Sequence, residues 1–302
     1  MSISVVIPAF NRADSIVPAV ESALAQGPEV SEVIVVDDAS ADDTVARVQA
    51  AYGADPRVKV IALEKNGGGG HARNVGIDVA TGDLLAFLDS DDTWHAGKLA
   101  KQMVATRGLT NFLCFTNLEV DSGDGAAPTP WNTHVWTEGS TVRQYVLELN
   151  QAIQTSTWLM PTEAARKVRF DGSLRRHQDI DFVLRAADAG LNFVYVSETL
   201  VSYSADPKAP RTSQRKNAKP SLHWMEQASA YLPEKDIAAF YLKHVFDIEF
   251  ADAPLRALGR CLGHAMKGHN PISSTLNVVA RNVIPPSVKT QLKRLVGKEA
   301  TA

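Results

Sequence analysis

The stretch that decides the fold runs from residue 84 to residue 92 and reads Leu84-Leu85-Ala86-Phe87-Leu88-Asp89-Ser90-Asp91-Asp92. Its apolar half predicts a strand buried on both faces, and carboxylates follow at once. Similar apolar runs lie at 3–7, 32–36 and 58–63, and they are separated by segments with helical apolar spacing at 14–26, 42–52 and 71–80. Strands that alternate with helices predict an α/β fold with a mostly parallel, Rossmann-like central sheet and flanking helices.

Composition places the 302-residue chain among ordinary globular proteins, with 45% hydrophobic and 22% charged residues. These values argue against disordered and fibrous classes. The two cysteines, Cys114 and Cys261, are far apart and show no C-x-x-C spacing, so we expect neither a disulfide framework nor a zinc site, and a reducing compartment. With no run of 18 apolar residues and no cationic leader before Ile3, we expect a cytoplasmic protein rather than a secreted or membrane-spanning one.

Charge is distributed unevenly along the chain. Residues 1–255 hold 23 basic and 33 acidic residues, whereas 256–298 hold eight basic residues and no acid. Those eight are Arg256, Arg260, Lys267, Arg281, Lys289, Lys293, Arg294 and Lys298. We therefore predict one domain over 1–205 and a helical, basic C-terminal region over 206–302.

The end of this basic region, from Ile284 onward, reads as an amphipathic cationic helix with two interpretations. It could lie on an anionic membrane surface, which would make the protein peripheral on the inner face of the membrane. It could instead pack on the domain over 1–205 or on a second subunit in a homodimer. Nucleic acid is disfavoured as a partner because no aromatic-plus-basic motif accompanies the charges.

Polar residues follow each of the four predicted strands, where ligands of parallel sheets collect. The four strand ends are Pro8-Ala9-Phe10-Asn11-Arg12, Asp37-Asp38-Ala39-Ser40, Glu64-Lys65-Asn66 with Gly67 to Gly70, and Asp89-Ser90-Asp91-Asp92. Further along the chain we predict strands at 111–118, 153–160 and 192–196, a helix at 178–190, and helices from about 220 onward.

The acidic cluster at 89–92 brings three carboxylates together, and such crowding favours a hard divalent cation, Mn²⁺ or Mg²⁺. These ions also bind substrate phosphates, which indicates a nucleotide diphosphate partner. The alternative is a helix N-cap before a segment that starts near His95.

Two further clusters each allow two interpretations, the second acidic cluster at 37–43 and the glycine run at 67–70. Ser40 and Asp43 have capping-box spacing, but Asp38 could also accept hydrogen bonds from a base or ribose. The glycines at 67–70 could cradle a phosphate, and Arg73 could bind one bidentately or be a surface arginine. No G-x-G-x-x-G follows the first strand, which argues against a dinucleotide-dependent oxidoreductase.

These blocks together resemble glycosyltransferase family 2, the inverting nucleotide-sugar transferases of the A-type fold. The resemblance covers about residues 1–205. It rests on Val5-Val6-Ile7-Pro8-Ala9-Phe10-Asn11-Arg12, Val35-Val36-Asp37-Asp38-Ala39-Ser40, Asn66-Gly67 through Ala72-Arg73-Asn74-Val75-Gly76, and Phe87-Leu88-Asp89-Ser90-Asp91-Asp92.

The resemblance implies a role for each matched residue of the donor site. Pro8 and Phe10 belong to the base pocket, Asp38 binds the base, and Arg73 contacts the base or the diphosphate. Asp89 and Asp91 form the D-x-D pair. In that pair Asp91 ligates the metal directly, and Asp89 lies nearer the ribose and the metal.

The stretch 175–182 resembles the family's general-base motif and puts Asp179 at the base. Gln178 stands where the family usually has Glu, and Asp181 is the alternative base; helix capping is the other reading of both aspartates. His177 could contact acceptor or diphosphate, or be a polar neighbour. Trp158, like Trp131 and Trp136, could stack on a sugar or fill the core. His223 is a weak candidate for a further metal ligand.

The resemblance implies an inverting glycosyltransferase of bacterial polysaccharide assembly. It implies a nucleotide-diphosphate sugar donor, with UDP ahead of GDP or dTDP, a glycan or lipid-linked acceptor, and Mn²⁺ or Mg²⁺ as cofactor. The alternative function is a non-catalytic nucleotide- or sugar-binding module of the same fold.

Overall fold

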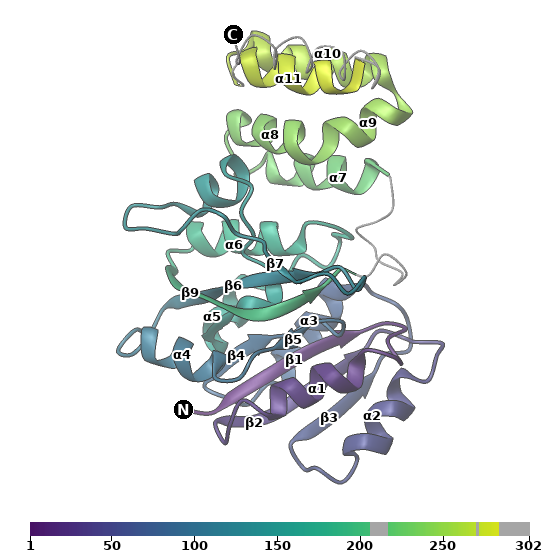
Figure 1. The fold of residues 1–302 in the computed structure, drawn as a ribbon, viewed down its shortest axis with the longest axis vertical. Coiled ribbons are helices and arrows are strands. Elements are labelled where there is room, and N and C mark those ends of the chain that lie inside the picture. Colours follow the sequence, from purple (N-terminus) through teal and green to yellow (C-terminus); the bar gives the residue numbers. More distant parts are fainter. Residues whose placement is uncertain (206–216, 270–271, 284–302) are drawn as a thin grey trace. The chain divides into compact units, whose positions relative to one another are not determined.

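The computed structural model describes residues 1–205, 217–269 and 272–283 (Figure 1). The chain divides into two compact units, Met1–Gln214 and Arg215–Ala302.

The first unit is built on one sheet with strand order β3-β2-β1-β4-β8-β6-β9-β5. Its first four strands are parallel and match the four apolar runs that the sequence predicted. They are β1 (Ile3–Ala9), β2 (Val30–Asp37), β3 (Val58–Ala62) and β4 (Leu84–Phe87). Helices α1 (Ile16–Leu24), α2 (Thr44–Tyr52) and α3 (Gly69–Val79) connect them. The predicted α/β fold is confirmed, and the carboxyl ends of these strands share one edge.

The other half of the sheet is mixed. Strand β8 (Leu159–Pro161) runs antiparallel to β4 and to β6 (Phe112–Asp121), and β9 (Asn192–Ser204) runs parallel to β6. The short strands β5 (Thr93–Trp94) and β7 (Thr129–Pro130) pair antiparallel with β9 and β6. The predicted strand at 153–160 is wrong in its first half, where a 3-10 turn spans Thr155–Thr157. The side chain of Gln154 accepts from the Ser156 N–H at 2.7 Å and stabilises this turn.

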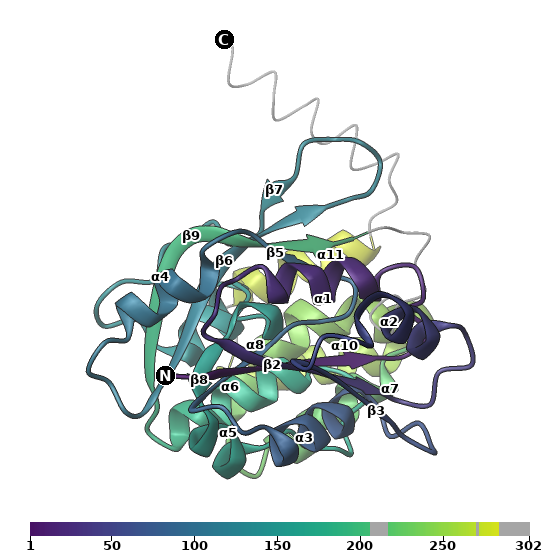
Figure 2. The same ribbon diagram turned by 90° about the horizontal axis from the view of Figure 1, so that it is seen from below.

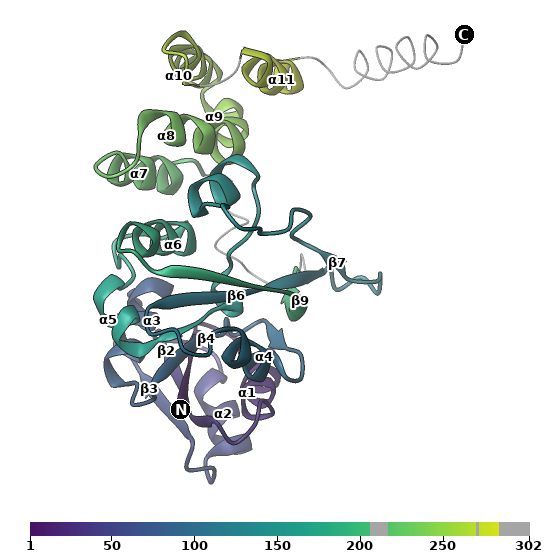
Figure 3. The same ribbon diagram turned by 90° about the vertical axis from the view of Figure 1, so that its left-hand side faces the viewer.

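Helices cover both faces of the sheet. Figure 2 shows α1 and α2 on one face of the parallel strands and α3 with α5 (Thr162–Val168) on the other. Helix α4 (Lys98–Ala105) contacts β6 and β9, and α6 (Gln178–Asp188) lies beside the same strands in Figures 1 and 3.

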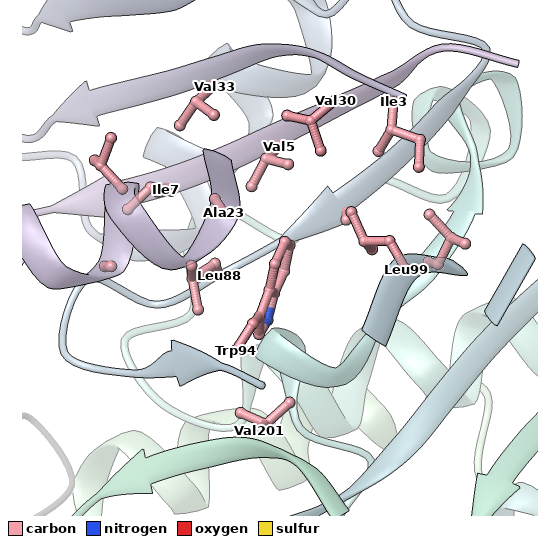
Figure 4. Packing of buried hydrophobic residues seen from close by; sticks show 14 of the residues in the cluster. Ile3, Val5, Ile7, Ala23, Val30, Val33, Leu88, Trp94, Leu99 and Val201 are labelled. Atoms are coloured by element: carbon pink, nitrogen blue, oxygen red, sulfur yellow. The ribbon is translucent and has the colours of Figure 1, made fainter. Parts of the chain in front are cut away.

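A wholly apolar core fills the space between α1 and the sheet (Figure 4). Ile3, Val5 and Ile7 of β1 point into it beside Leu88 and Trp94, and all five are buried. Burying one such aliphatic side chain stabilises the fold by roughly 1.5–3 kcal/mol, so this core holds the strands in place at the edge where their polar ends meet.

The second unit is helical in its described residues. It contains α7 (Lys219–Ala228), α8 (Glu234–Phe240), α9 (Phe246–Asp252), α10 (Pro254–Met266) and α11 (Ile272–Val283), with a π-helical turn at Tyr241–Val245. Trp224, Phe240 and Phe246 are completely buried in its core. No described helix of either unit has the length and apolar character needed to span a bilayer. The cationic helix predicted from Ile284 onward lies outside the described residues.

Gly76 lets α3 approach β1 closely. A Cβ at this position would lie 2.3 Å from Cγ1 of Val6, which is completely buried. Since Val6 has no room to move, a side chain here would push α3 away from the sheet, and with it the site residue Arg73.

We predict that Gly76→Ala lowers the free energy of unfolding by about 1–3 kcal/mol, because of the overpacking against Val6. The midpoint of urea denaturation measures it. Gly263→Ala is the control, since a Cβ in that helix meets nothing within 4 Å and should stabilise by up to about 1 kcal/mol. Equal stability of Gly76→Ala and the wild type would contradict the close approach.

Candidate functional site

Hydrogen bonds join the loops after β1 and β2. The N–H of Asn11 donates to Ser40 Oγ at 2.8 Å, and the N–H of Ala41 donates to Asn11 Oδ1 at 2.8 Å. Helix α2 begins only at Thr44, so the predicted capping role of Ser40 is wrong: its hydroxyl serves the neighbouring loop. Asn11 and Ala39 have φ angles of 53° and 61°, a conformation that non-glycine residues seldom adopt outside constrained sites.

The predicted base-pocket residues lie at the end of β1. Pro8 is partly buried, and Phe10 directly after the strand leaves 44% of its surface exposed. An exposed aromatic ring at a strand end is a suitable surface for a nucleobase to stack on. Their contact with a base stays a prediction.

Asp38 fixes the glycine loop. It is buried, and its two carboxylate oxygens accept from the N–H groups of Gly67 and Gly68, both at 2.7 Å. Because these two N–H groups already donate to Asp38, they do not form the phosphate cradle that the glycine run predicted. Gly68 has a φ of 89°, and a Cβ there would lie 2.5 Å from the Arg175 guanidinium. The glycine is therefore required both by its backbone conformation and by the arginine beside it.

The three carboxylates after β4 have different environments. Asp89 accepts from Arg73 Nη2 at 2.6 Å and from Gln154 Nε2 at 3.0 Å. Asp91 forms an ion pair with Arg12 at 3.6 Å. Asp92 is buried and accepts from the Ser156 hydroxyl at 2.7 Å, which rules out the alternative that it caps a following helix.

The surroundings of Asp92 disfavour its ionised form. Burial raises its pKa well above the ordinary value, and the charges of Asp89 and Asp91 raise it further. Of the three carboxylates, the two that are partly exposed, Asp89 and Asp91, each have an arginine beside them.

Arg73 joins two parts of the chain that the sequence keeps far apart. Its guanidinium donates to Asp89 and, through Nη1, to Gln178 Oε1 at 3.0 Å, and it lies over the Phe170 ring at 5.3 Å. Only 8% of Arg73 is exposed, so the surface-arginine alternative is wrong. Its buried Nε has no hydrogen-bond partner among the described residues.

The predicted base motif forms the start of α6. Gln178 accepts from Arg73 and donates to the Leu174 carbonyl at 2.6 Å. Next to it, Asp179 is partly buried, and this burial raises its pKa, with the charge of Asp89 acting in the same direction and that of Arg73 against it. His177 precedes the helix with a φ of 63°. Through Arg73, the start of α6 is therefore connected to residues 89–92, which form the acidic turn after β4.

Asp181, the alternative base, is placed differently. It is buried and forms an ion pair with Arg185 one turn later at 2.7 Å. Its carboxylate therefore holds α6 rather than facing an acceptor, which leaves Asp179 as the base candidate of this motif.

The tryptophans divide between core and surface. Trp158 is completely buried against Phe87 and Phe182, so it presents no face to a sugar, and its predicted acceptor contact is corrected to a core role. Trp136 packs on Phe115, whereas Trp131 is 39% exposed.

The donor atoms at the acidic turn suit a hard cation. Asp89 and Asp91 are both partly exposed and offer carboxylate oxygens, the ligands that Mg²⁺ and Mn²⁺ prefer. No group of three or more acidic, histidine or cysteine side chains within the described ranges could hold a metal by itself. The residues therefore fit a cation that a substrate diphosphate also ligates. His223 lies in α7 of the second unit, where it lines a pocket with Lys219 and Arg260.

Gln154 and Ser156 are site residues that sequence reasoning missed. The Gln154 amide donates to Asp89 and to Asp92, and the Ser156 hydroxyl accepts from the Asp89 N–H at 2.9 Å. One signal was present: the polar run Gln154-Thr155-Ser156-Thr157 interrupts what reads as a buried apolar strand. Nothing in the sequence indicated that it would contact residues more than 60 positions earlier.

The sequence matches the family model described as Glycosyl transferase family 2 over residues 4–160, which is more than half of the chain. The chain belongs to glycosyl transferase family 2. The resemblance inferred from the motifs is confirmed, and the matched segment includes all four strand ends described above.

Relatives of this family 2 member include proteins named for bacterial polysaccharide biosynthesis. The amylovoran biosynthesis glycosyltransferase AmsB of Erwinia amylovora is 31% identical over 80% of this chain and 82% of its own length. The succinoglycan biosynthesis protein ExoO of Rhizobium meliloti is 36% identical over 62% and 56%. The putative teichuronic acid biosynthesis glycosyltransferase TuaG of Bacillus subtilis is 31% identical over 67% and 78%.

Solved structures agree with the fold. The crystal structure of S. aureus TarS 1-349 in complex with UDP-GlcNAc superimposes with a TM-score of 0.66 at 19% identity, over 92% of this chain and 90% of that one. At this identity the likeness concerns the fold alone.

We predict that Gln154→Ala lowers the glycosyltransferase kcat/KM about 10- to 100-fold, because hydrogen bonds to charged groups contribute about 1.5–3 kcal/mol each and Asp89 loses one. The measurement is the initial rate of nucleotide release. Gln49→Ala, an exposed glutamine on α2, is the matched control and should leave the rate unchanged. A Gln154 variant as fast as this control would show that the hydrogen bond from Gln154 does not position Asp89.

Proposed function

We propose that this glycosyltransferase moves a sugar from a nucleotide-diphosphate donor to an acceptor hydroxyl with inversion at the anomeric carbon. One observation carries the proposal. Arg73 connects the acidic turn after β4 to the start of α6 by hydrogen bonds to Asp89 and Gln178, so the residues predicted for donor binding and for proton removal belong to one site.

The chemistry assigned to Asp179 follows from a single displacement. The acceptor hydroxyl must lose its proton as it attacks the anomeric carbon, and a carboxylate within hydrogen-bond reach of it can take that proton. The raised pKa makes Asp179 a stronger base than an exposed aspartate. Gln178 has no charge to compete for the proton, and it keeps Arg73 in place.

The donor proposed is a UDP-sugar. S. aureus TarS, which shares the fold, has been crystallised with UDP and with UDP-GlcNAc, and this supports the same nucleotide here. Phe10, exposed at the end of β1, offers a ring for the base. Asp38 would act on the donor through the glycine loop that it holds, since both its oxygens already accept from that loop.

Asp91 and Asp89 would hold Mn²⁺ or Mg²⁺ together with the donor diphosphate. The ion would supply positive charge that stabilises the departing nucleoside diphosphate. With two carboxylates balanced by two arginines, the described site has little net positive charge of its own for a diphosphate, and this supports the cation.

The acceptor proposed is a glycan or a lipid-linked sugar, in keeping with the amylovoran, succinoglycan and teichuronic acid pathways named for the relatives. A cytoplasmic location and a homodimer stay predictions.

We predict that Asp179→Asn lowers kcat by about 10²- to 10⁴-fold, because the amide cannot accept the acceptor proton, and leaves the Kd for the UDP-sugar within about twofold. The measurements are single-turnover transfer and calorimetric binding. Asp188→Asn, exposed at the far end of the same helix, is the control. Donor binding without transfer by the wild type would favour a non-catalytic binding module instead.

The pH profile gives a separate check on the base. Asp179 must be deprotonated to act, so kcat should fall as pH falls through its pKa, and the raised pKa should place this acid limb above the ordinary aspartate value of about 3.9. A kcat that stays constant down to that pH would argue against Asp179.

We predict that chelation by EDTA lowers transfer at least about 100-fold, that Mn²⁺ restores it, and that Asp91→Asn weakens Mn²⁺ binding in the presence of UDP about tenfold or more. Electron paramagnetic resonance of free Mn²⁺ measures the binding. Asp124→Asn, in an exposed loop, is the control. Full activity in EDTA would exclude the cation.

A further inference from the structure

The segment 171–178, which leads into the base candidate, packs directly on the glycine loop, residues 67–70. A Cβ on Gly69 would lie 3.3 Å from Gln178 Oε1, and a Cβ on Gly70 would lie 3.2 Å from the Asp171 carbonyl oxygen. Both distances are below the 3.4–4 Å of ordinary van der Waals contact. Because glycines have no Cβ, the two stretches of chain can approach this closely. The glycine loop therefore sets the place of the segment 171–178.

Arg175 of this segment lies on the loop at Gly68. A Cβ on Gly68 would lie 2.5 Å from Arg175 Nη1, so the guanidinium occupies the space that a side chain would fill. The same Nη1 donates to Asn66 Oδ1 at 3.4 Å. One residue further along, a Cβ on Gly69 would lie 3.1 Å from Arg73 Nη1. Two guanidinium groups thus lie against consecutive residues, whose Cα atoms are about 3.8 Å apart.

The two arginines differ in their charge balance. Arg73 is 8% exposed and pairs with Asp89 at 2.6 Å. Arg175 is exposed, and no carboxylate in the described parts of the chain forms an ion pair with it. Its positive charge is therefore not balanced there, and a negatively charged group beside it would be stabilised.

Arg185 shows how a structural arginine of the same region is satisfied. It donates to the Asp181 carboxylate at 2.8 Å. It also donates to the carbonyl oxygens of Val168 and Arg169 at 2.6 and 2.8 Å. Arg175 makes no comparable contact with the residues that the structure describes. Its guanidinium is consequently able to donate to a ligand.

The glycine loop connects Arg175 to the predicted donor site. Asp38, after β2, accepts from the N–H groups of Gly67 and Gly68, and Arg73 joins the loop to Asp89 after β4. Phosphate is the anionic group that the proposed substrates bring to this edge of the sheet. A guanidinium matches two oxygens of a phosphate with parallel hydrogen bonds.

We propose that Arg175 binds a phosphate group of a substrate, with its guanidinium held for this contact by the glycine loop. The inference rests on the proposed function, in which the donor carries a diphosphate and a lipid-linked acceptor carries phosphate as well. It adds a charged contact with the substrate on the segment that precedes Asp179. A single arginine does not balance a diphosphate, so the proposed cation is still required.

Calorimetric titration of the full chain with inorganic pyrophosphate, in the presence of Mg²⁺, tests the phosphate contact without a nucleoside. We expect Arg175→Gln to raise the Kd for pyrophosphate about tenfold or more, because hydrogen bonds between charged groups are the stronger ones. Arg175→Lys keeps the charge but loses the planar pair of donors. Its Kd should lie between those of the wild type and Arg175→Gln.

Titration with UDP identifies the substrate that supplies the phosphate. If it is the donor, Arg175→Gln raises the Kd for UDP about tenfold, leaves the Kd for uridine unchanged, and pyrophosphate competes with UDP. If it is the acceptor, the Kd for UDP is unchanged, and pyrophosphate binds to protein that is already saturated with UDP. In that case Arg175→Gln weakens only the binding of pyrophosphate.

Arg107→Gln is the matched control. Arg107 is also exposed, but it lies between α4 and the start of β6. This variant should bind pyrophosphate and UDP as the wild type does. Both glutamine variants should keep the wild-type midpoint of thermal unfolding, since neither arginine is buried. A loss of binding in Arg175→Gln would then come from the lost contact and not from a damaged fold.

Two results would overturn the proposal. One is a wild type that binds neither pyrophosphate nor UDP, and the other is an Arg175→Gln protein that binds both as tightly as Arg107→Gln does. A failure of the proposed function gives a different pattern. A wild type that binds pyrophosphate through Arg175 but does not bind UDP would exclude the UDP-sugar donor and support the phosphate contact.

Discussion

The geometry of the site depends on the buried guanidinium of Arg73. It holds Asp89, which follows β4, and Gln178, which begins α6, although these residues are 89 positions apart in the chain. Helix α3 can present the arginine there because Gly76 packs directly on Val6 of β1. The core, the close helix approach and the site are consequently linked, and a displacement of α3 would separate the acidic turn from the base motif.

Ion pairs and burial stabilise residues 89–92, the acidic turn after β4. Arg73 and Arg12 each balance one carboxylate, and burial raises the pKa of Asp92, whereas the hydrogen bonds that it accepts from the Ser156 hydroxyl and the Ser204 N–H act in the opposite direction. Desolvation thus disfavours a charge that water would have stabilised. Because each of these arginines is already paired with a carboxylate, a cation bound with the donor would balance the charge of the proposed diphosphate.

The sequence predicted those elements whose hydrophobic pattern lies within the element itself. The four apolar runs are strands because Val, Ile and Leu without polar alternation must be covered on both sides, and the polar residues after them meet because parallel strands end at one edge. The apolar content of residues 153–160 indicates a strand. In the structure the side chains of Gln154 and Thr157 form hydrogen bonds with nearby backbone groups, and a turn forms in the first half of the region instead. Local hydrogen bonds of this kind compete with the strand for the same backbone groups.

The sequence by itself determined the alternating sheet and helices, the family, and the residue types at each strand end. Only the tertiary structure decided what those residues do to one another: Asp38 holds the glycine loop, Trp158 is buried in the core, and burial raises the pKa of Asp92. The physical reason is that burial and charge balance depend on contacts between segments tens of residues apart. A sequence motif records which groups are present, and the fold sets their distances and their exposure to water.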